Sequence, residues 1–325
     1  MRLLKLVPDD TNIHFLKWRV PFYSVSAFLI IASIALVFIK GLNLGVDFVG
    51  GQQILVTFTQ SKEAPVAELR EQVAGLGYGE PVIQIAGNKN EVSIRFPLPE
   101  EVADNPAASD EMTTTVVNSI KSEFKDARID DLSSVSGKVS GELFTTAMYA
   151  LGFAMLAISI YIWVRFEWQF GVGALFALVH DVSLTMGMFA LFQIEFDLKI
   201  VAAILTIIGY SLNDTIVIYD RIRENMKKYR KMQLPELLDL SVNETLARTV
   251  MTSLTILVVL VALLLIGPAS LFGFTAAITL GIFVGTYSSV YMAAPILIWL
   301  GVDSHSFVPE EDAGDKAGPL ARGEV

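Results

Sequence analysis

Residues 249–302 read TVMTSLTILVVLVALLLIGPASLFGFTAAITLGIFVGTYSSVYMAAPILIWLGV, a stretch without a single charged side chain. About 20 apolar residues in a helix are enough to cross the hydrocarbon core of a bilayer, so this stretch is long enough for two crossings. Gly267 and Pro268 interrupt it, and proline lacks the amide hydrogen that a continuing helix needs. The stretch therefore predicts two transmembrane helices, 249–266 and 273–300, joined by a tight turn.

Four more runs with few or no charges lie upstream of this stretch. They predict further membrane spans at 20–39, 142–164, 168–194 and 198–219. The first run is followed by a lysine and not by a small-residue cleavage site, so we expect it to remain as an anchor. The fold class expected is an α-helical polytopic membrane protein with six transmembrane helices.

The composition agrees with a membrane protein and excludes several other classes. Of the 325 residues, 53% are hydrophobic and only 18% are charged, whereas about a quarter are charged in soluble domains. The net charge of −10 argues against nucleic acid as a partner, since phosphate binding needs clustered lysine and arginine. The chain has no cysteine, which excludes disulfides and thiolate metal sites.

The distribution of lysine and arginine predicts the orientation in the membrane. Basic residues gather in the N-terminal segment 1–19, in the loop after the second span and in the loop 220–248, while the opposite loops are nearly free of them. Because short loops rich in lysine and arginine stay inside, we expect both termini, including the tail 301–325, in the cytoplasm. Residues 40–141 would then lie outside, in the periplasm.

This outer segment is long enough to form a small α+β domain. Alternating apolar residues and turn residues predict the order βαββαβ, the split ferredoxin-like arrangement. The expected strands are 52–58, 81–86, 91–96 and 129–139, and the expected helices are 65–74 and 111–125, the second with Asp110 as its N-cap. Fifteen acidic and eight basic residues lie between 41 and 141, which is most simply a solvated acidic face, and we expect no metal site there.

Ionisable residues inside the predicted spans are the candidates for function, because a charge in hydrocarbon is costly. Asp214 lies in the fourth span and Arg248 opens the fifth, so the two can pair in the same leaflet. A carboxylate that a mobile arginine approaches and leaves can bind and release a proton. His180 and Asp181 lie in the third span, and Asn213 adds an amide that can hold water beside Asp214.

Simpler interpretations of the same residues stay open. Arg248 can extend its side chain to the membrane interface without any partner. His180 and Asp181 can be a structural polar pair between helices, and the serines and threonines of the spans can serve helix packing. Asp214 is the hardest of these residues to explain by structure alone.

Several motifs together resemble the SecD/SecF family, and SecF members in particular. They are GVDFVGG at 45–51, VHDV at 179–182, GYSLNDT at 209–215, YDRIRE at 219–224 and TLART at 245–249. The resemblance runs from the first span to about Gly301 and keeps the layout of six spans. The family belongs to the resistance-nodulation-division superfamily and assists protein export through the Sec pathway of the bacterial inner membrane.

The resemblance implies a mechanism and a set of partners. The proton-motive force would drive late preprotein export, with Asp214 and Arg248 as the proton relay and His180, Asp181 and Asn213 in support. Gly45, Asp47, Gly50 and Gly51 look like the motif that opens the outer domain, where glycine permits turns that other residues avoid. Protons would be the only coupling species, with no cofactor and no metal. The expected partners are a SecD chain, the SecYEG channel, YajC, preproteins and membrane lipid, with no nucleic acid.

Three other functions compete with proton-coupled export. Asp181 and Asp214 lie on consecutive spans, as in an intramembrane aspartyl protease, but no Gly-x-Gly-Asp element surrounds either residue. An assembly factor would use the polar residues only to lock helices together. Efflux of small molecules would normally need a second half or a larger outer domain. No ATPase or hydrolase motif is present, so we do not expect an enzyme.

Overall fold

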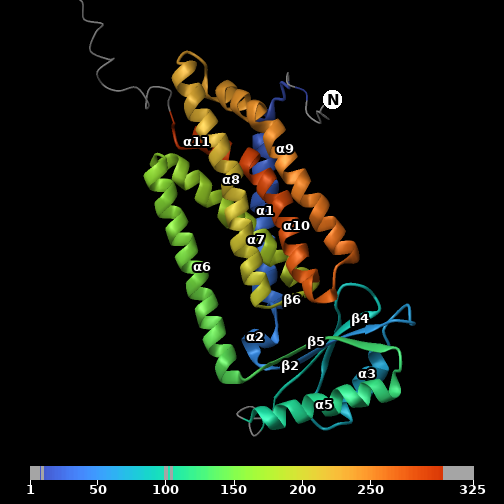
Figure 1. The fold of residues 1–325 in the computed structure, drawn as a ribbon. Coiled ribbons are helices and arrows are strands. Elements are labelled where there is room, and N and C mark those ends of the chain that lie inside the picture. Colours follow the sequence, from blue (N-terminus) through green and yellow to red (C-terminus); the bar gives the residue numbers. More distant parts are fainter. Residues whose placement is uncertain (1–7, 9–10, 99–101, 103–104, 303–325) are drawn as a thin grey trace, which may run out of the picture.

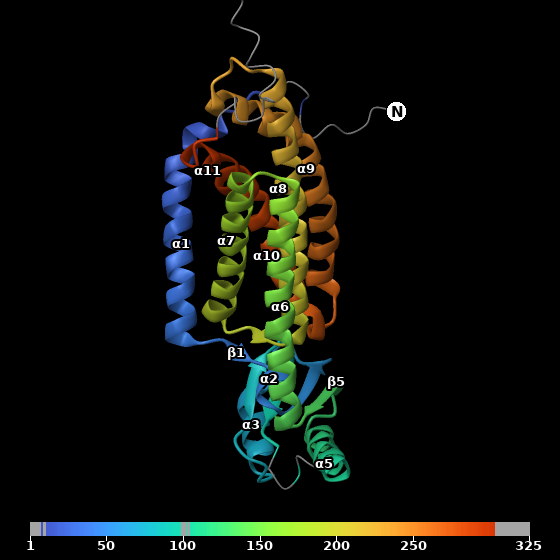
Figure 2. The same ribbon diagram turned by 90° about the vertical axis from the view of Figure 1, so that its left-hand side faces the viewer.

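The computed structural model describes residue 8, residues 11–98, residue 102 and residues 105–302. Within this part of the chain, six helical segments are long and apolar enough to cross a membrane. They include α1 (Arg19–Lys40), α6 (Gly137–Arg165), α7 (Trp168–Phe192), α8 (Leu198–Lys228) and α9 (Leu234–Ile266). The last segment is α10 (Phe272–Ser288), a π-helical turn (Ser289–Ala293) and α11 (Ala294–Trp299). Figures 1 and 2 show these helices as one bundle with an α/β domain at one end.

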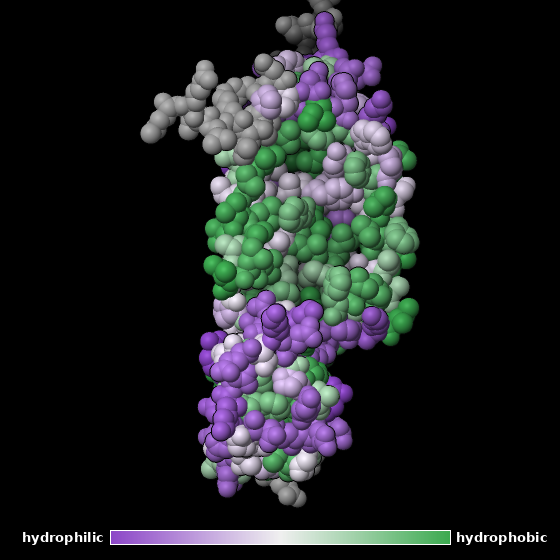
Figure 3. Space-filling view, turned by 90° about the vertical axis from the view of Figure 1, so that its right-hand side faces the viewer, coloured by the Kyte–Doolittle hydropathy of each residue, from purple (hydrophilic) through white to green (hydrophobic). Residues whose placement is uncertain are grey.

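The surface of the bundle has the apolar band that a bilayer requires. Figure 3 shows hydrophobic residues over the middle of the molecule and hydrophilic residues above and below them. The most deeply buried helices are α7, α8 and α10, whereas most of α1, α6 and α9 is exposed. Glycine brings the inner helices close together: a side chain added at Gly281 would collide with Ile207 of α8. Close approach through small residues is typical of helix packing in membranes.

At the end of the bundle opposite the α/β domain, helices α8 and α9 are longer than the sequence predicts. Helix α8 continues to Lys228 and α9 begins at Leu234, so most of the expected loop 220–248 is helical. The extension has its own core, which includes Met226 and Leu237, both fully buried. The amide of Asn225 also donates to the Ser241 hydroxyl at 3.0 Å and to Glu244 at 2.6 Å. Burial and these bonds keep the backbone helical beyond the hydrocarbon.

The start of α6 also differs from the expected one and a capping residue explains the difference, whereas α9 ends where expected, at residue 266. Helix α6 begins at Gly137, five residues before 142, because the Ser136 side chain accepts a hydrogen bond from the Val139 amide. Helix α9 ends at Ile266, directly before Gly267 and Pro268. A short 3₁₀ turn (Ala269–Leu271) then leads into α10, while α1 is preceded by a similar turn (Phe15–Trp18). The tail 303–325 lies outside the described residues.

The α/β domain follows the order β, α, β, β, α, β. Its elements are β2 (Gly51–Phe58), α3 (Val66–Ala74), β3 (Val82–Ile85), β4 (Glu91–Phe96), α5 (Pro106–Glu123) and β5 (Ala127–Val135). The strands lie side by side in the order β3-β4-β2-β5, and all neighbours are antiparallel. Alternate residues of β2, among them Ile54, Val56 and Phe58, pack with α3 and α5 in the core. The other face of the sheet points toward the membrane helices.

Two local predictions for this domain are wrong. Helix α5 begins at Pro106 and not at residue 111, because the Asn105 side chain accepts from the Ala108 amide and caps the helix. Asp110 therefore lies inside the helix. The last strand ends at Val135 and not at 139, because Ser136 already caps α6.

Three short elements join the domain to the bundle. Strand β1 (Asn43–Leu44) pairs in parallel with β6 (Glu195–Phe196), which lies between α7 and α8. Helix α2 (Val46–Val49) follows β1 and packs against α6. Segments about 150 residues apart in the sequence thus meet between the membrane helices and the sheet (Figure 2).

Candidate functional site

Asp214 is a buried carboxylate in which only one of the two oxygens has a hydrogen bond among the described residues. It lies on α8 and is 4% exposed. The Thr249 hydroxyl of α9 donates to its Oδ1 atom over 3.3 Å. Its Oδ2 atom is buried and has no hydrogen-bond partner within the described chain. Leaving a buried acceptor unpaired costs about 1–3 kcal/mol, more when it is charged, so this oxygen is suited to receive a proton or a donor from elsewhere.

Arg248 lies next to this carboxylate but is not paired with it. It precedes Thr249 on α9, and its side chain is exposed on the surface of the bundle. Among the described residues, no carboxylate lies within the 4.0 Å ion-pair distance of Arg248. Successive residues of a helix point about 100° apart, so Thr249 faces α8 while Arg248 turns outward. In this structure the two expected relay residues are neighbours that do not touch.

Asn213 is likewise not brought into contact with Asp214. Its side chain is exposed on the surface of α8, although it is adjacent in sequence to the buried carboxylate. The exposed Asn213 and Arg248 therefore lie on outward faces of neighbouring helices.

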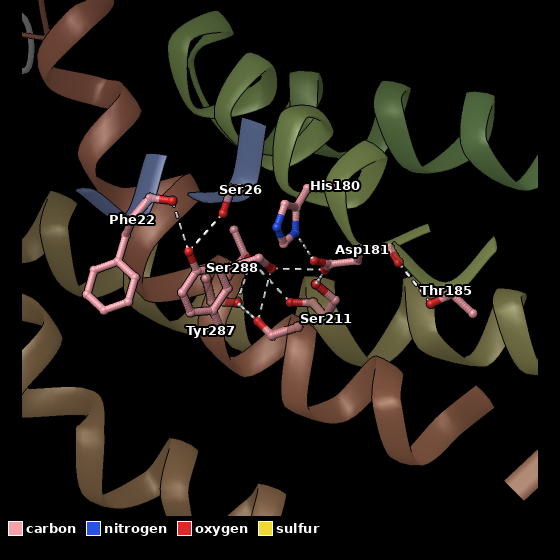
Figure 4. A network of polar contacts seen from close by, with 11 residues as sticks. Phe22, Ser26, His180, Asp181, Thr185, Ser211, Tyr287 and Ser288 are labelled. Carbon is pink, nitrogen blue, oxygen red and sulfur yellow. Dashed lines mark hydrogen bonds and ion pairs between the residues drawn. The ribbon is translucent and has the colours of Figure 1, made fainter. Parts of the chain in front are cut away.

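His180 and Asp181 form the centre of a second, fully buried polar cluster. Both side chains are 0% exposed, and His180 Nδ1 lies 2.9 Å from Asp181 Oδ1. The hydroxyls of Ser211 on α8 and Ser288 on α10 donate to Asp181 Oδ2 over 2.5 and 2.9 Å (Figure 4). Helices α7, α8 and α10 are thereby joined at one carboxylate. The other imidazole nitrogen, His180 Nε2, is buried without a partner in the part of the chain described.

The cluster extends toward α1 and along α8 through hydroxyl groups. Tyr287, whose ring lies 5.8 Å from that of His180, shares a 2.8 Å hydrogen bond with Ser26 of α1. Thr215 shares a 3.0 Å bond with Ser289, the first residue of the π-helical turn. Sequence reasoning missed Tyr287, Ser288 and Ser289. The sequence does contain a signal for these residues, because they are consecutive polar residues within an uncharged span.

The two intramembrane carboxylates do not form a protease dyad. Asp181 bonds to Ser211 on one side of α8, whereas Asp214 bonds to α9 on another. An aspartyl protease needs two carboxylates close enough to share one proton. The described structure contains no hydrogen bond between them, so it offers no support for that alternative.

The motif at 45–51 lies where the chain leaves the membrane and enters the sheet. The Gly45 amide donates to the Phe196 carbonyl at 2.9 Å, and the Leu198 amide donates to Asp47 Oδ2 at 3.0 Å. Gly50 and Gly51 have φ angles of 75° and 120°, a region that favours glycine. A side chain at Gly51 would also collide with the Phe96 carbonyl of β4. The glycines permit the sharp turn into β2, and Asp47 reaches the start of α8.

The carboxyls of Glu195 and Asp197 lie near this motif and outside the spans, and the pKa of each is raised. Burial raises the pKa of the Glu195 carboxyl above its ordinary value, although Arg95 opposes the shift and Asp197 adds to it. Burial also raises the pKa of Asp197, which caps α8, against the effect of Lys199. Sequence reasoning did not single out either residue, because their burial depends on how the sheet lies over β6.

Comparison with known proteins identifies the family. The family model described as "Protein export membrane protein SecD/SecF, C-terminal" matches residues 115–303, and the "SecD/SecF GG Motif" model matches 35–62. The chain is 43% identical over 322 residues to the "Protein translocase subunit SecF" of Cereibacter sphaeroides, covering 97% of this chain and 96% of the relative. It belongs to the SecF family. The family's general role is in protein export, and the resemblance seen in the sequence is confirmed.

Other relatives agree with this assignment. The SecF subunit of Rhodobacter capsulatus is 42% identical with 96% of each chain covered, and that of Rickettsia bellii is 40% identical with 90% and 95% covered. The crystal structure of SecDF from Thermus thermophilus superposes with a TM-score of 0.80 and 35% identity over 90% of this chain. The chain spans only 39% of that SecDF chain. A second structure, SecDF in a super-membrane-facing form, gives a TM-score of 0.63 at 34% identity.

Proposed function

We propose that this chain uses the proton-motive force to drive late stages of preprotein export, with Asp214 as the proton-binding group. The observation that carries the proposal is the half-satisfied carboxylate: Asp214 is buried, holds one long hydrogen bond and keeps one oxygen free. A structural carboxylate in hydrocarbon would be expected to have its acceptors filled. Protons are the coupling species, and no further cofactor is needed.

Arg248 is the second member of the proposed relay. An exposed arginine on a span, without an anionic partner among the described residues of its own chain, needs a counter-charge or an escape to the interface. We propose that a companion SecD chain supplies the counter-charge, and that Arg248 moves between it and Asp214. Approach of the guanidinium favours the ionised carboxylate and withdrawal favours the protonated one. His180, Asp181 and Asn213 are proposed as supporting residues, with the Asp181 cluster holding α7, α8 and α10 in register.

The orientation proposed has the α/β domain, a ferredoxin-like unit, in the periplasm and both termini in the cytoplasm. The end of α6 and the end of α8 lie at the end of the bundle opposite the α/β domain (Figure 1), and they carry Arg165 and the basic residues Lys227 and Lys228. That asymmetry is the one that the positive-inside rule associates with the cytoplasm. The proposed setting is the bacterial inner membrane, with SecD, SecYEG, YajC and preproteins as partners.

The test is force-driven export in proteoliposomes that contain this chain, SecD and SecYEG. Asp214→Asn should lose proton flux and force-dependent export together, because an amide does not release a proton in this pH range. Asp220→Asn is the matched control, since Asp220 lies on the same helix but is exposed and pairs with Arg165. Unchanged export by Asp214→Asn would overturn the relay and leave a role in assembly.

A further inference from the structure

Two of the contacts between the α/β domain and the membrane helices differ in character. One, here called the anchor, consists of Gly45, Asp47 and Phe48 against Phe196 and Leu198. The other, here called the dock, is the sheet face formed by Gln53, Gln84, Ser93 and Arg95 against Asn43, Leu44 and Glu195. Both lie at the membrane surface, but they differ in packing and in the kind of bond that crosses them.

The anchor is close-packed and uses backbone groups. The Gly45 amide bonds to the Phe196 carbonyl at 2.9 Å, and Asp47 accepts from the Leu198 amide at 3.0 Å. The Phe48 ring is 8% exposed and lies 5.6 Å from the Phe144 ring of α6 and 5.9 Å from that of Phe196. Backbone bonds inside an apolar cluster leave little room for relative movement.

The dock is polar and incompletely packed. Glu195 accepts from the Gln53 amide at 2.7 Å, and Arg95 donates to the Leu44 carbonyl and to Asn43 Oδ1, each at 2.7 Å. A cavity of about 360 Å³ lies between the sheet, the α7–α8 connection and the start of α10. Side-chain contacts beside a cavity transmit displacement less firmly than close packing does. Of these two contacts, the anchor is therefore the one that transmits a displacement of the bundle to the domain more firmly.

Asp47 connects that anchor to the helix that carries Asp214. Helix α8 is continuous from Leu198 to Lys228, so Asp214 lies sixteen residues, or about 24 Å, from the amide that Asp47 holds. Asp47 is not the local cap of this helix, because the Asp197 side chain already accepts from the Ile200 amide at 3.1 Å. Asp47 thus accepts a hydrogen bond from the first amide of α8, and it belongs to the motif that leads into the α/β domain.

We propose that Asp47 is a positioning residue that couples movement of α8 to movement of the α/β domain. The inference rests on the proposed function, because it needs α8 to shift when Asp214 gains or loses a proton. In this arrangement the Asp47–Leu198 bond transmits the shift of α8 to α2 and the sheet, while the side-chain hydrogen bonds of the dock rearrange. Loss of the bond uncouples the domain from the relay and leaves the relay itself intact.

The experiment uses the full chain with SecD and SecYEG in proteoliposomes and measures proton flux and export separately. Asp47→Ala should keep proton flux within about twofold of the wild type and lower export at least fivefold. Asp47→Asn should regain at least half of the export, since asparagine is as good an acceptor at a helix N-terminus. Asp197→Ala is the matched control: it removes a cap from the same helix end without cutting the link to the domain, and export per proton should not change.

A distance measurement separates coupling from stability. The chain contains no cysteine, so spin labels can be attached at Lys121→Cys on α5 and Lys227→Cys on α8, both exposed positions. A proton gradient should change the distance between them in the wild type and not in Asp47→Ala. If Asp47→Ala is too unstable to purify, Asp47→Leu or Asp47→Ser serves in the same assay, with coupling expected only in the serine variant.

The outcomes distinguish this inference from the proposed function. Proton flux and export falling in parallel in Asp47→Ala would overturn the coupling role and indicate a purely structural one, as would normal export. An absence of Asp214-dependent flux in the wild type would instead overturn the proposed function. An equal loss of export per proton in Asp197→Ala would show that capping of α8, and not the link to the domain, is what matters.

Discussion

The two carboxylates inside the bundle, Asp181 on α7 and Asp214 on α8, lie on neighbouring helices. They differ in the number of hydrogen bonds that the surrounding residues donate to them. Asp181 is completely buried and bonds to His180, Ser211 and Ser288. Asp214 is almost as buried, yet it has one 3.3 Å bond and one free oxygen. The first has its hydrogen-bonding needs met by its own chain, and the second does not. Burial alone therefore does not distinguish the two carboxylates; the unfilled acceptor of Asp214 does.

The difference follows from which helices surround each residue. Asp181 lies on α7 among the inner helices, where serine hydroxyls of α8 and α10 converge on it. Asp214 faces the outer helix α9, whose exposed Arg248 lies beside Thr249, the only donor to this carboxylate in the described part of the chain. We infer that Asp181 holds the inner helices together, whereas Asp214 is left available to a proton and to a neighbouring chain.

The strongest test of this comparison is Asp181→Ala. The change leaves His180, Ser211 and Ser288 buried without their common acceptor, so we expect a loss of about 3–5 kcal/mol in unfolding free energy. Unfolding of the purified protein in detergent micelles measures it. Asp181→Asn keeps one acceptor oxygen and should lose clearly less. A loss below about 1 kcal/mol in Asp181→Ala would show that the cluster is not structural.

Removal of one donor from the same cluster should have a smaller effect. Ser288→Ala takes away one of the bonds to Asp181 and should cost about 1–3 kcal/mol in the same unfolding assay. Ser270, which is half-buried in the turn before α10 and whose hydroxyl has no hydrogen bond among the described residues, supplies the control: Ser270→Ala should stay within about 0.5 kcal/mol of the wild type. Equal effects at the two serines would contradict the special role of the cluster.

Glu195 extends the comparison to a carboxyl outside the bilayer, since it too has one bonded and one unpaired oxygen. Burial raises its pKa above the ordinary 4.5 in the docked arrangement, so docking favours the protonated form. The docked state should therefore become more stable as pH falls through the raised pKa toward 4.5, and less stable as pH rises above it. The charged groups that act on it are Arg95, which opposes the shift, and Asp197, which adds to it.

The pH dependence of docking can be measured as the distance between two spin labels, one on each side of the dock, recorded between pH 4.5 and 8. The distance distribution should narrow at low pH in the wild type and lose its pH dependence in Glu195→Gln. Glu63→Gln is the control, because Glu63 is exposed and pairs only with Lys89 among the described residues. Persistence of the pH dependence in Glu195→Gln would assign it to Asp197 instead, whose pKa burial also raises.

The smallest expected change in stability is that of Asp214→Asn. Because Asp214 makes only one long hydrogen bond, its replacement should alter the unfolding free energy by less than about 1 kcal/mol, even though force-driven export is expected to be lost. The same micelle assay as for Asp181→Ala gives a direct comparison. Destabilisation as large as that of Asp181→Ala would mean that both carboxylates are structural.

Much of the fold could be predicted because it depends on local pattern. The break at Gly267 and Pro268, the six apolar runs and the alternation along β2 are each visible within a short window. The helical pattern of residues 221–228 is visible in the sequence, but their unbroken continuation of α8 to Lys228 was not predicted, because the apolar residues that hold the extension pack against each other only in the fold. The start of α5 was misplaced because Asn105 and Asp110 are equally plausible caps in the sequence.

The sequence by itself determined that the chain crosses the membrane six times, that a small α/β domain follows the first span, and that Asp181 and Asp214 are the carboxyls inside the bundle. Each of these depends on hydropathy or periodicity over neighbouring residues. Only the tertiary structure decided which carboxylate is satisfied, that Arg248 turns outward, and that Asp47 reaches the start of α8. These depend on contacts between residues up to about 150 positions apart, which are set by helix packing and leave no trace in local sequence.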